Sequence, residues 1–181
     1  GRRQQALAYF SKAREREQNA YRADKWVDLI ASTRYWLTLD EADAAAARAD
    51  WARAEALYRR AQQQDPASVY AVLGLGDVAL GRGELGEAER RYRQARRMAP
   101  ANESAVRGLV RVYERTSPQA AMAFLDGLPA RLRQPFLALR TRLELDQLTA
   151  QADAAVARDD WPAAAQALGR AQTLAPDDAW L

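Results

Sequence analysis

An apolar face returns along this chain at the spacing of an α-helix. Each copy has a small residue, a large apolar residue four positions later and a second small residue three positions after that, so all three lie on one side of a helix. Five copies occur: Ala6-Phe10-Ala13, Ala54-Tyr58-Ala61, Ala88-Tyr92-Ala95, Ala120-Phe124-Gly127 and Ala164-Leu168-Ala171. A small residue lets a second helix come close, and the large residue fills the space beside that contact. The pattern therefore predicts helices that pack against one another.

Proline residues mark where several of these helices end. Three copies run into Asp65-Pro66, Ala99-Pro100 and Ala175-Pro176, and a proline lacks the N–H and restricts the preceding residue, which stops a helix. Pro66 and Pro100 are 34 residues apart, as are Ala54 and Ala88. A helix-turn-helix unit of this period resembles the tetratricopeptide repeat (TPR). The resemblance implies an all-α fold, a TPR α-solenoid with the form of a right-handed superhelix.

Two repeat junctions are longer than this period. The spacing of the copies rises to 48 residues before Ala54 and to 44 residues before Ala164. No glycine or proline interrupts Trp26 to Asp50 or Phe136 to Asp160, so we expect one long helix in each junction, or a short helix running into the next. The residues suited to begin these helices are Asp24 and Gln134-Pro135.

The chain is expected to form a single TPR array. We divide it into the second helix of an incomplete repeat (1–19), an added helical segment (20–34), two repeats (35–68 and 69–102), a shortened repeat (103–128), a second added segment (129–144) and a repeat (145–178). Part of each added segment should lack its regular partner helix. A TPR unit cannot bury its apolar face alone, and no polar capping helix is visible at either end. We therefore expect a part of a longer array, with a further unit beginning at residues 177–181.

Composition supports a helical, non-catalytic chain. Alanine fills 41 positions, whereas valine, isoleucine and threonine together fill 15, which favours helices over strands. There is no cysteine and no histidine, so the usual zinc sites, thiol nucleophiles and Ser-His-Asp triads cannot be built. We expect no catalytic residue, no cofactor and no metal. The net charge of +3 gives little support to a nucleic-acid partner, and no apolar run approaches the length of about 20 residues that crosses a membrane.

A narrower resemblance rests on four stretches of the sequence. They are Arg34-Tyr35-Trp36-Leu37, residues 68–79, Ala105-Val106-Arg107-Gly108-Leu109 and Ser117-Pro118-Gln119-Ala120. Together with the shortened repeat and the long helix after it, they resemble the periplasmic TPR region of a family found in bacterial cellulose synthase complexes, the cellulose synthase operon protein C family. The resemblance implies a periplasmic location in an outer-membrane-anchored bacterial protein, whose TPR array precedes an outer-membrane barrel that exports the glucan. Protein partners would then belong to the cellulose secretion complex.

First helices of TPR units line a concave surface, which gives a candidate groove. Its predicted residues are Trp36, Asp43, Tyr70, Asp77, Arg107, Arg111 and Asp153, with Leu39, Leu73, Ser104, Asp146 and Thr149 beside them. Such surfaces commonly bind extended peptides, and we favour a segment of a protein partner. A glucan chain is an alternative, because aromatic rings flanked by charged groups can stack on and hydrogen-bond to sugars. Since Trp36 and Tyr70 stand a whole repeat apart, we expect soluble cello-oligosaccharides to bind weakly or not at all.

Two charged clusters have structural explanations that we favour. Asp159 and Asp160 resemble a carboxylate pair of a glycosidase, but they precede Trp161 at a position typical of a helix cap. The arginine-rich face formed by Arg90, Arg91, Arg93, Arg96 and Arg97 could meet peptidoglycan or an acidic partner. Because Glu84, Glu87 and Glu89 lie within a turn or two, we expect a solvated helix face instead.

The function predicted from the sequence is that of a non-catalytic periplasmic scaffold. Through the resemblance, it would link the inner-membrane synthase to the outer-membrane pore of the cellulose machinery by protein contacts. The alternative is a generic TPR adaptor that binds an extended peptide in its groove. A clamp for an acidic C-terminal tail is disfavoured, because Leu39, Asp43 and Asp77 stand where lysine and asparagine would be needed.

Overall fold

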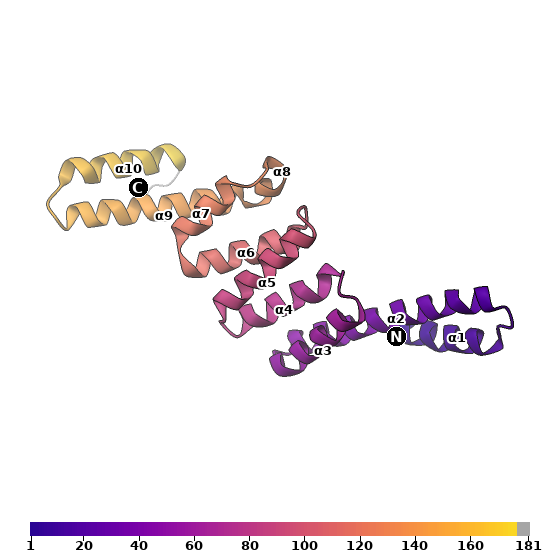
Figure 1. Cartoon of the computed structure of the whole chain (residues 1–181). Coiled ribbons are helices and arrows are strands. Elements are labelled where there is room, and N and C mark those ends of the chain that lie inside the picture. The colour runs from indigo at the N-terminus through magenta and orange to yellow at the C-terminus, as the bar shows by residue number, and fades with distance from the viewer. Residues whose placement is uncertain (177–181) are drawn as a thin grey trace. The chain divides into compact units, whose positions relative to one another are not determined.

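The computed structural model describes residues 1–176, and every regular element in that range is a helix (Figure 1). The elements are α1 (Arg2–Arg16), α2 (Ala20–Ala47), α3 (Trp51–Gln64), α4 (Val69–Gly81), α5 (Leu85–Met98), α6 (Glu103–Thr116), α7 (Pro118–Asp126), α8 (Ala130–Arg133), the 3-10 turn η1 (Gln134–Phe136), α9 (Leu137–Val156) and α10 (Trp161–Leu174). The all-α prediction is confirmed. The further unit expected at residues 177–181 lies outside the described residues.

The chain divides into two compact units, Gly1–Leu109 and Val110–Leu181, each described by itself. In the first unit, consecutive helices pack as hairpins, α1 on α2, α2 on α3 and α4 on α5, and α3 packs on α4. In the second unit, α9 packs along α10 and also contacts α7. The described helices thus cover their apolar faces mainly with their neighbours in sequence, as expected for a repeat array.

The long helix α2 begins earlier than predicted and has a partner. Its N-cap is Asn19, whose side chain accepts a hydrogen bond from the backbone N–H of Arg22, so the predicted start at Asp24 was wrong. Asparagine is as good an N-cap as aspartate, and no residue between Asn19 and Asp24 interrupts the helix. Helix α1 packs on α2, and the ring centroids of Phe10 and Trp26 lie 5.9 Å apart. Helix α1 is thus a partner for residues 20–34, although Val27 and Leu29 of this segment stay exposed.

The second junction takes the other predicted form, a short helix running into a longer one. The α-helical part α9 begins at Leu137, three residues after the predicted start, because Gln134 and Pro135 form the 3-10 turn η1 behind α8. The Nε of Arg140 on α9 lies 2.8 Å from Oδ1 of Asp126 at the end of α7. The start of α9 is thus held against α7, although Leu137 stays exposed.

Three of the hairpin turns share one backbone feature, a residue in the left-handed conformation. These residues are Ala49 (φ 56) between α2 and α3, Gly83 (φ 78) between α4 and α5, and Asp159 (φ 58) between α9 and α10. After two of these turns an aspartate caps the following helix, with Asp50 accepting from the Arg53 N–H and Asp160 from the Ala163 N–H. The predicted capping role of Asp160 is confirmed.

Packing between successive hairpins depends on a tyrosine placed against a glycine. The buried Tyr58 of α3 lies so close to α4 that a Cβ added at Gly74 would stand 2.2 Å from its Cε1. The buried Tyr92 of α5 meets α6 in the same way, and a Cβ at Gly108 would stand 2.4 Å from its ring. Ala54 and Ala88, four positions before these tyrosines, are fully buried, as the small-residue pattern predicts.

Candidate functional site

A hollow of about 340 Å³ lies in the first unit, mainly between α2 and α4; we call it the groove. Its lining includes Arg3, Trp36, Leu39, Asp40, Asp43, Tyr58, Tyr70, Leu73, Gly74, Asp77 and Ser104. The structure thus brings together Trp36, Asp43, Tyr70 and Asp77 from the predicted set. That these residues bind a partner stays a prediction.

Two of the three groove aspartates, Asp43 and Asp77, are held by tyrosines of the second helices. The hydroxyl of Tyr58 donates a hydrogen bond of 2.6 Å to Oδ1 of Asp43, and the hydroxyl of Tyr92 donates one of 2.7 Å to Oδ1 of Asp77. Burial, reinforced by the hydrogen bond to Asp43, raises the pKa of the Tyr58 hydroxyl far above its usual value. These carboxylates therefore have a structural role in addition to the negative charge that they bring to the groove.

Three aromatic side chains meet at one end of the groove. The ring centroids of Trp36 and Tyr70 are 5.3 Å apart at an interplanar angle of 57°, and Tyr35 meets Trp36 edge-on, also at 5.3 Å. The expectation that Trp36 and Tyr70 stand apart was wrong. Positions separated by one repeat occupy equivalent places on adjacent first helices, and helix axes about 8–10 Å apart leave large rings within reach. We call Tyr35, Trp36 and Tyr70 the aromatic cluster.

An arginine from the start of the chain lies on this cluster. The guanidinium of Arg3 stands 5.4 Å from the centre of the Trp36 ring and forms an ion pair with Asp40. The sequence analysis missed both charged residues. Asp40 was detectable, because it follows Trp36 by one helical turn and shares its face. Arg3 was not, since the register of α1 against α2 is set by tertiary packing.

A second, larger hollow is lined by all three residues of the aromatic cluster and shares Trp36 and Tyr70 with the groove; we call it the cleft. It has a volume of about 680 Å³ and lies between α2 and the connection from α3 to α4. Its lining residues are Ala31, Ser32, Arg34, Tyr35, Trp36, Gln64, Asp65, Ala67, Ser68, Val69 and Tyr70. The hydroxyls of Tyr35 and Ser68 are hydrogen-bonded across its floor. The cleft was not predicted from the sequence, because Asp65, Ala67 and Ser68 of the connection between α3 and α4 form part of its wall.

The remaining predicted groove residues are spread over the two units. Arg107 is exposed on α6, close to Ser104 of the groove. Arg111 and Asp153 are exposed residues of the second unit, on α6 and α9. Whether they extend one binding surface stays a prediction.

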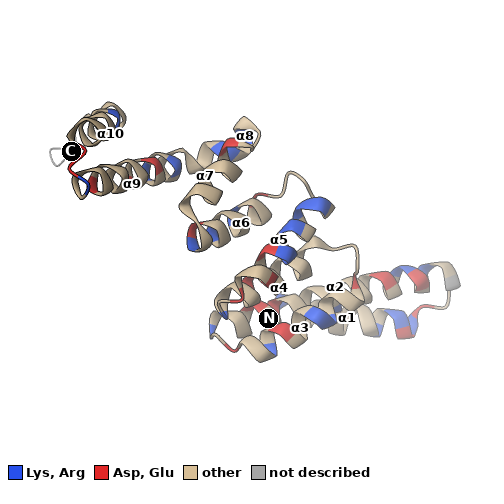
Figure 2. Cartoon of the chain, turned by 60° about the vertical axis from the view of Figure 1, so that its left-hand side comes forward, with Lys and Arg blue, Asp and Glu red and all other residues tan. Residues whose placement is uncertain are grey.

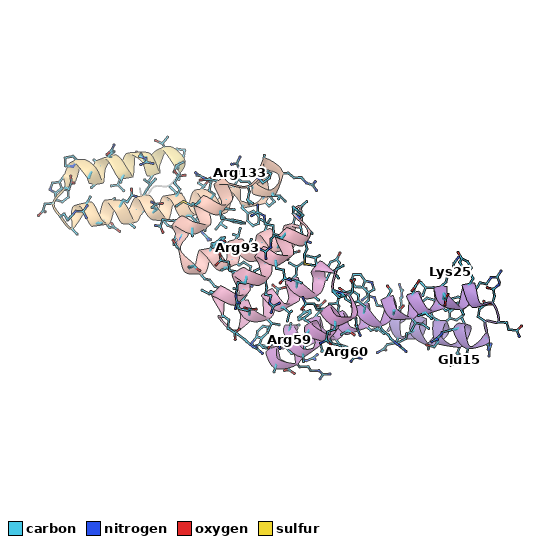
Figure 3. All side chains as sticks on the ribbon, viewed as in Figure 1. Glu15, Lys25, Arg59, Arg60, Arg93 and Arg133 are labelled. Atoms are coloured by element: carbon cyan, nitrogen blue, oxygen red, sulfur yellow. The ribbon has the colours of Figure 1, made fainter. Side chains whose placement is uncertain are left out.

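The arginine-rich helix α5 carries its own counter-charges. Arg91 lies 2.7 Å from Glu87 and Arg93 lies 2.8 Å from Glu89, while Arg90 also pairs with Glu87. The hydrogen bond from Arg91 is the main cause that lowers the pKa of Glu87. Figure 2 accordingly shows both red and blue segments on α5, and Arg93 stands on the surface of that helix (Figure 3). These ion pairs support the prediction of a solvated helix face.

Residues 1–176 show neither of two common functional features. No cluster of three or more histidine, cysteine, aspartate or glutamate side chains with metal-binding geometry occurs among them. Within the same residues, no helix combines the length and the apolar character needed to pass through a bilayer.

The comparison with known proteins agrees with the fold. Residues 45–112 match the sequence model of the tetratricopeptide repeat family. With its helical hairpins and 34-residue spacing, the chain is an all-α TPR solenoid, a class whose repeats are non-catalytic modules for protein interaction.

Proteins with similar sequences assign the chain to one family of TPR proteins. The chain is 47% identical over 174 residues, 96% of its length, to cellulose synthase operon protein C of Salmonella typhimurium. It is 45% identical over all 181 residues to the protein of the same name from Escherichia coli K12 and to a putative cellulose synthase operon protein C from Escherichia coli O157:H7. The resemblance to this family is confirmed. The chain spans only 15% to 16% of the length of these relatives.

Proposed function

We propose that this chain is part of a non-catalytic periplasmic scaffold in the bacterial machinery that makes and exports cellulose. The main support is the sequence identity of 45% to 47% with cellulose synthase operon protein C along nearly the whole chain. In this proposal the array links the inner-membrane synthase to the outer-membrane pore through protein contacts. TPR repeats are suited to this task, because each unit adds length and exposes a concave surface.

The groove is the surface that we assign to a protein partner. Asp40 and Asp43 make it acidic, and Trp36 and Tyr70 border it with aromatic rings. Arg3 already lies on Trp36 and pairs with Asp40, so the chain itself shows how an arginine side chain fits there. An extended, arginine-containing segment of another protein matches this charge and shape. The same contact would serve the alternative function, a generic TPR adaptor.

Location is the first point to test, and a cysteine introduced into this chain, which has none of its own, can serve as the reporter. Arg90 on α5 has a side chain that is 79% exposed, so Arg90→Cys places a thiol on the surface without disturbing the core. In cells that produce the whole protein, we expect this thiol to react with a reagent that enters the periplasm but does not cross the inner membrane. The whole protein without the substitution is the control. Labelling only after the cells are broken contradicts the proposal.

The scaffold role is tested by reversing one groove charge. In the whole protein, Asp40→Lys should reduce secreted cellulose and the co-purification of the synthase, at an unchanged protein level. Asp28→Lys is the matched control, because Asp28 is an exposed residue of the same helix outside the groove. Equal cellulose output from both variants removes the groove from the proposed function.

A further inference from the structure

The cleft has a preorganised aromatic wall. Tyr70 is 53% exposed, and the Trp36 ring stands beside it at 5.3 Å. Tyr35 supports Trp36 from the side, is only 5% exposed, and is fixed by its hydrogen bond to Ser68. A ring held in place by its neighbours loses little conformational entropy when a ligand stacks on it. Arg3 lies on Trp36 and lines only the groove, so we assign the stacking surface of the cleft to the exposed Tyr70.

The polar part of the cleft suits an uncharged ligand rich in hydroxyl groups. Arg34 and Asp65 bring opposite charges, and Ser32, Gln64 and Ser68 add hydroxyl and amide groups. The Asp65 carboxylate is oriented by the N–H of Ala67, which donates a hydrogen bond of 3.1 Å to it. The lining is therefore neutral in sum and mixes donors with acceptors, unlike the acidic groove. A cationic peptide should bind the acidic groove more tightly than the cleft, because opposite charges attract.

A pyranose ring matches both parts of this lining. Its equatorial hydroxyls form a polar edge, and its axial C–H bonds form apolar faces that pack on aromatic rings. The volume of about 680 Å³ falls within the roughly 300–1,000 Å³ of small-ligand sites. Trp36 and Tyr70 border both the cleft and the groove, so a linear chain of sugars can continue past them instead of ending in a closed pocket.

We propose that the cleft binds a neutral β-linked glucan, with one sugar face stacked on Tyr70 and hydroxyls bonded to Gln64, Asp65 and Arg34. That the sugar is glucose rests on the proposed function, whereas the inference of an uncharged pyranose ligand rests on the residues that line the cleft. This inference replaces the sequence-based expectation of weak or absent binding, because that expectation assumed separated aromatic residues. A site of this kind holds a passing chain loosely along the array.

The test is a titration of the full chain with cellohexaose, in which binding is measured by calorimetry and by tryptophan fluorescence. We expect saturable binding that Tyr70→Ala weakens about tenfold or more, the effect of losing one stacked ring. Tyr70→Phe should keep the affinity, because it keeps the ring. Tyr21→Ala is the matched control, since Tyr21 is 71% exposed on the same helix as Trp36 but far from the cleft. Circular dichroism of each variant verifies the fold.

Several outcomes overturn the inference. No saturable binding up to about 10 mM cellohexaose is one, and equal affinity of Tyr70→Ala and the unchanged chain is another. Binding of an arginine-rich peptide, but not of cellohexaose, in a Tyr70-dependent manner assigns the cleft to a protein partner. Equal binding of maltohexaose, whose linkages are α, removes the preference for a β-linked chain. Each of these results leaves the periplasmic labelling and the Asp40→Lys experiment unaffected, so the two proposals fail separately.

Discussion

Tyr58 donates a hydrogen bond of 2.6 Å from its hydroxyl to Asp43, fifteen positions before it, while its ring covers Gly74 on the next hairpin. One side chain thus joins both helices of its own hairpin to the first helix of the following one. Tyr92 repeats the arrangement with Asp77 and Gly108. The aspartate, the tyrosine and the glycine each recur after 34 residues, so the period in the sequence reflects a three-residue contact that is repeated between hairpins.

Replacing the glycine under the tyrosine should destabilise the array. A methyl group at Gly74 would stand 2.2 Å from the Tyr58 ring, and overpacking of this kind costs about 1–3 kcal/mol. We expect Gly74→Ala to lower the free energy of unfolding by that amount in urea denaturation. Gly86→Ala is the control, because its new Cβ meets nothing within 4 Å and alanine favours a helix. Equal midpoints for the two variants would contradict the packing described for Tyr58.

The hydroxyl of Tyr58 should make stability depend on pH in the alkaline range. Its pKa is raised in the folded chain, chiefly by burial, whereas in the unfolded chain it is about 10. The folded state therefore holds the proton more tightly, so this contribution is complete below about pH 10 and is lost as the pH rises further. Tyr58→Phe should show a shallower loss of stability above about pH 10 than the unchanged chain. Parallel curves of melting temperature against pH would contradict this expectation.

The turn between α2 and α3 is a place where glycine should improve on the natural residue. Ala49 has φ 56, a conformation that costs a residue with a Cβ about 1–2 kcal/mol. Ala49→Gly should raise the free energy of unfolding by about 0.5–1 kcal/mol, after the entropy cost of glycine is included. Ala52→Gly, in the first turn of α3, should change it in the opposite direction. Thermal unfolding followed by circular dichroism compares the two.

The ion pair between Asp126 and Arg140 should contribute little, and only above acidic pH. The hydrogen bond from Arg140 lowers the pKa of Asp126, so the contribution is present above the unfolded value of about 3.9 and is lost as the pH falls through the folded value. Both side chains are partly exposed, and such pairs are worth about 0–1 kcal/mol. Asp126→Asn should therefore reduce stability slightly at pH 7. A larger loss at pH 3 than at pH 7 would contradict this assignment.

The repeating part of the fold was predictable because each of its positions obeys a local rule. The buried Ala54 and Ala88 follow from helical periodicity, and the cap at Asp160 follows from its place before a helix. The start of α2 was misjudged because Asn19 and Asp24 are equally good caps, and only the packing of α1 decides between them.

The candidate site was less accessible to sequence reasoning, since it depends on distances between helices. The groove positions Trp36, Asp43 and Tyr70 came from the period alone and share one hollow in the structure. The contact between Trp36 and Tyr70 requires the separation of two helix axes, which no local pattern records. The cleft also requires the path of the connection from Gln64 to Ser68, which helical periodicity leaves undefined.

The packing of a tyrosine against Gly74 and against Gly108 has a consequence for how such arrays become longer in evolution. Gly74 accepts Tyr58 of the preceding hairpin, and Tyr92 of the hairpin that carries Gly74 packs in turn on Gly108. A tandem duplication of the 34 residues from 69 to 102 would therefore supply matching surfaces at both of its ends, and no compensating mutation would be required at the new boundary. Recombination between neighbouring units can change the length of the protein in whole steps, so natural selection can adjust its span by adding or removing copies instead of redesigning interfaces.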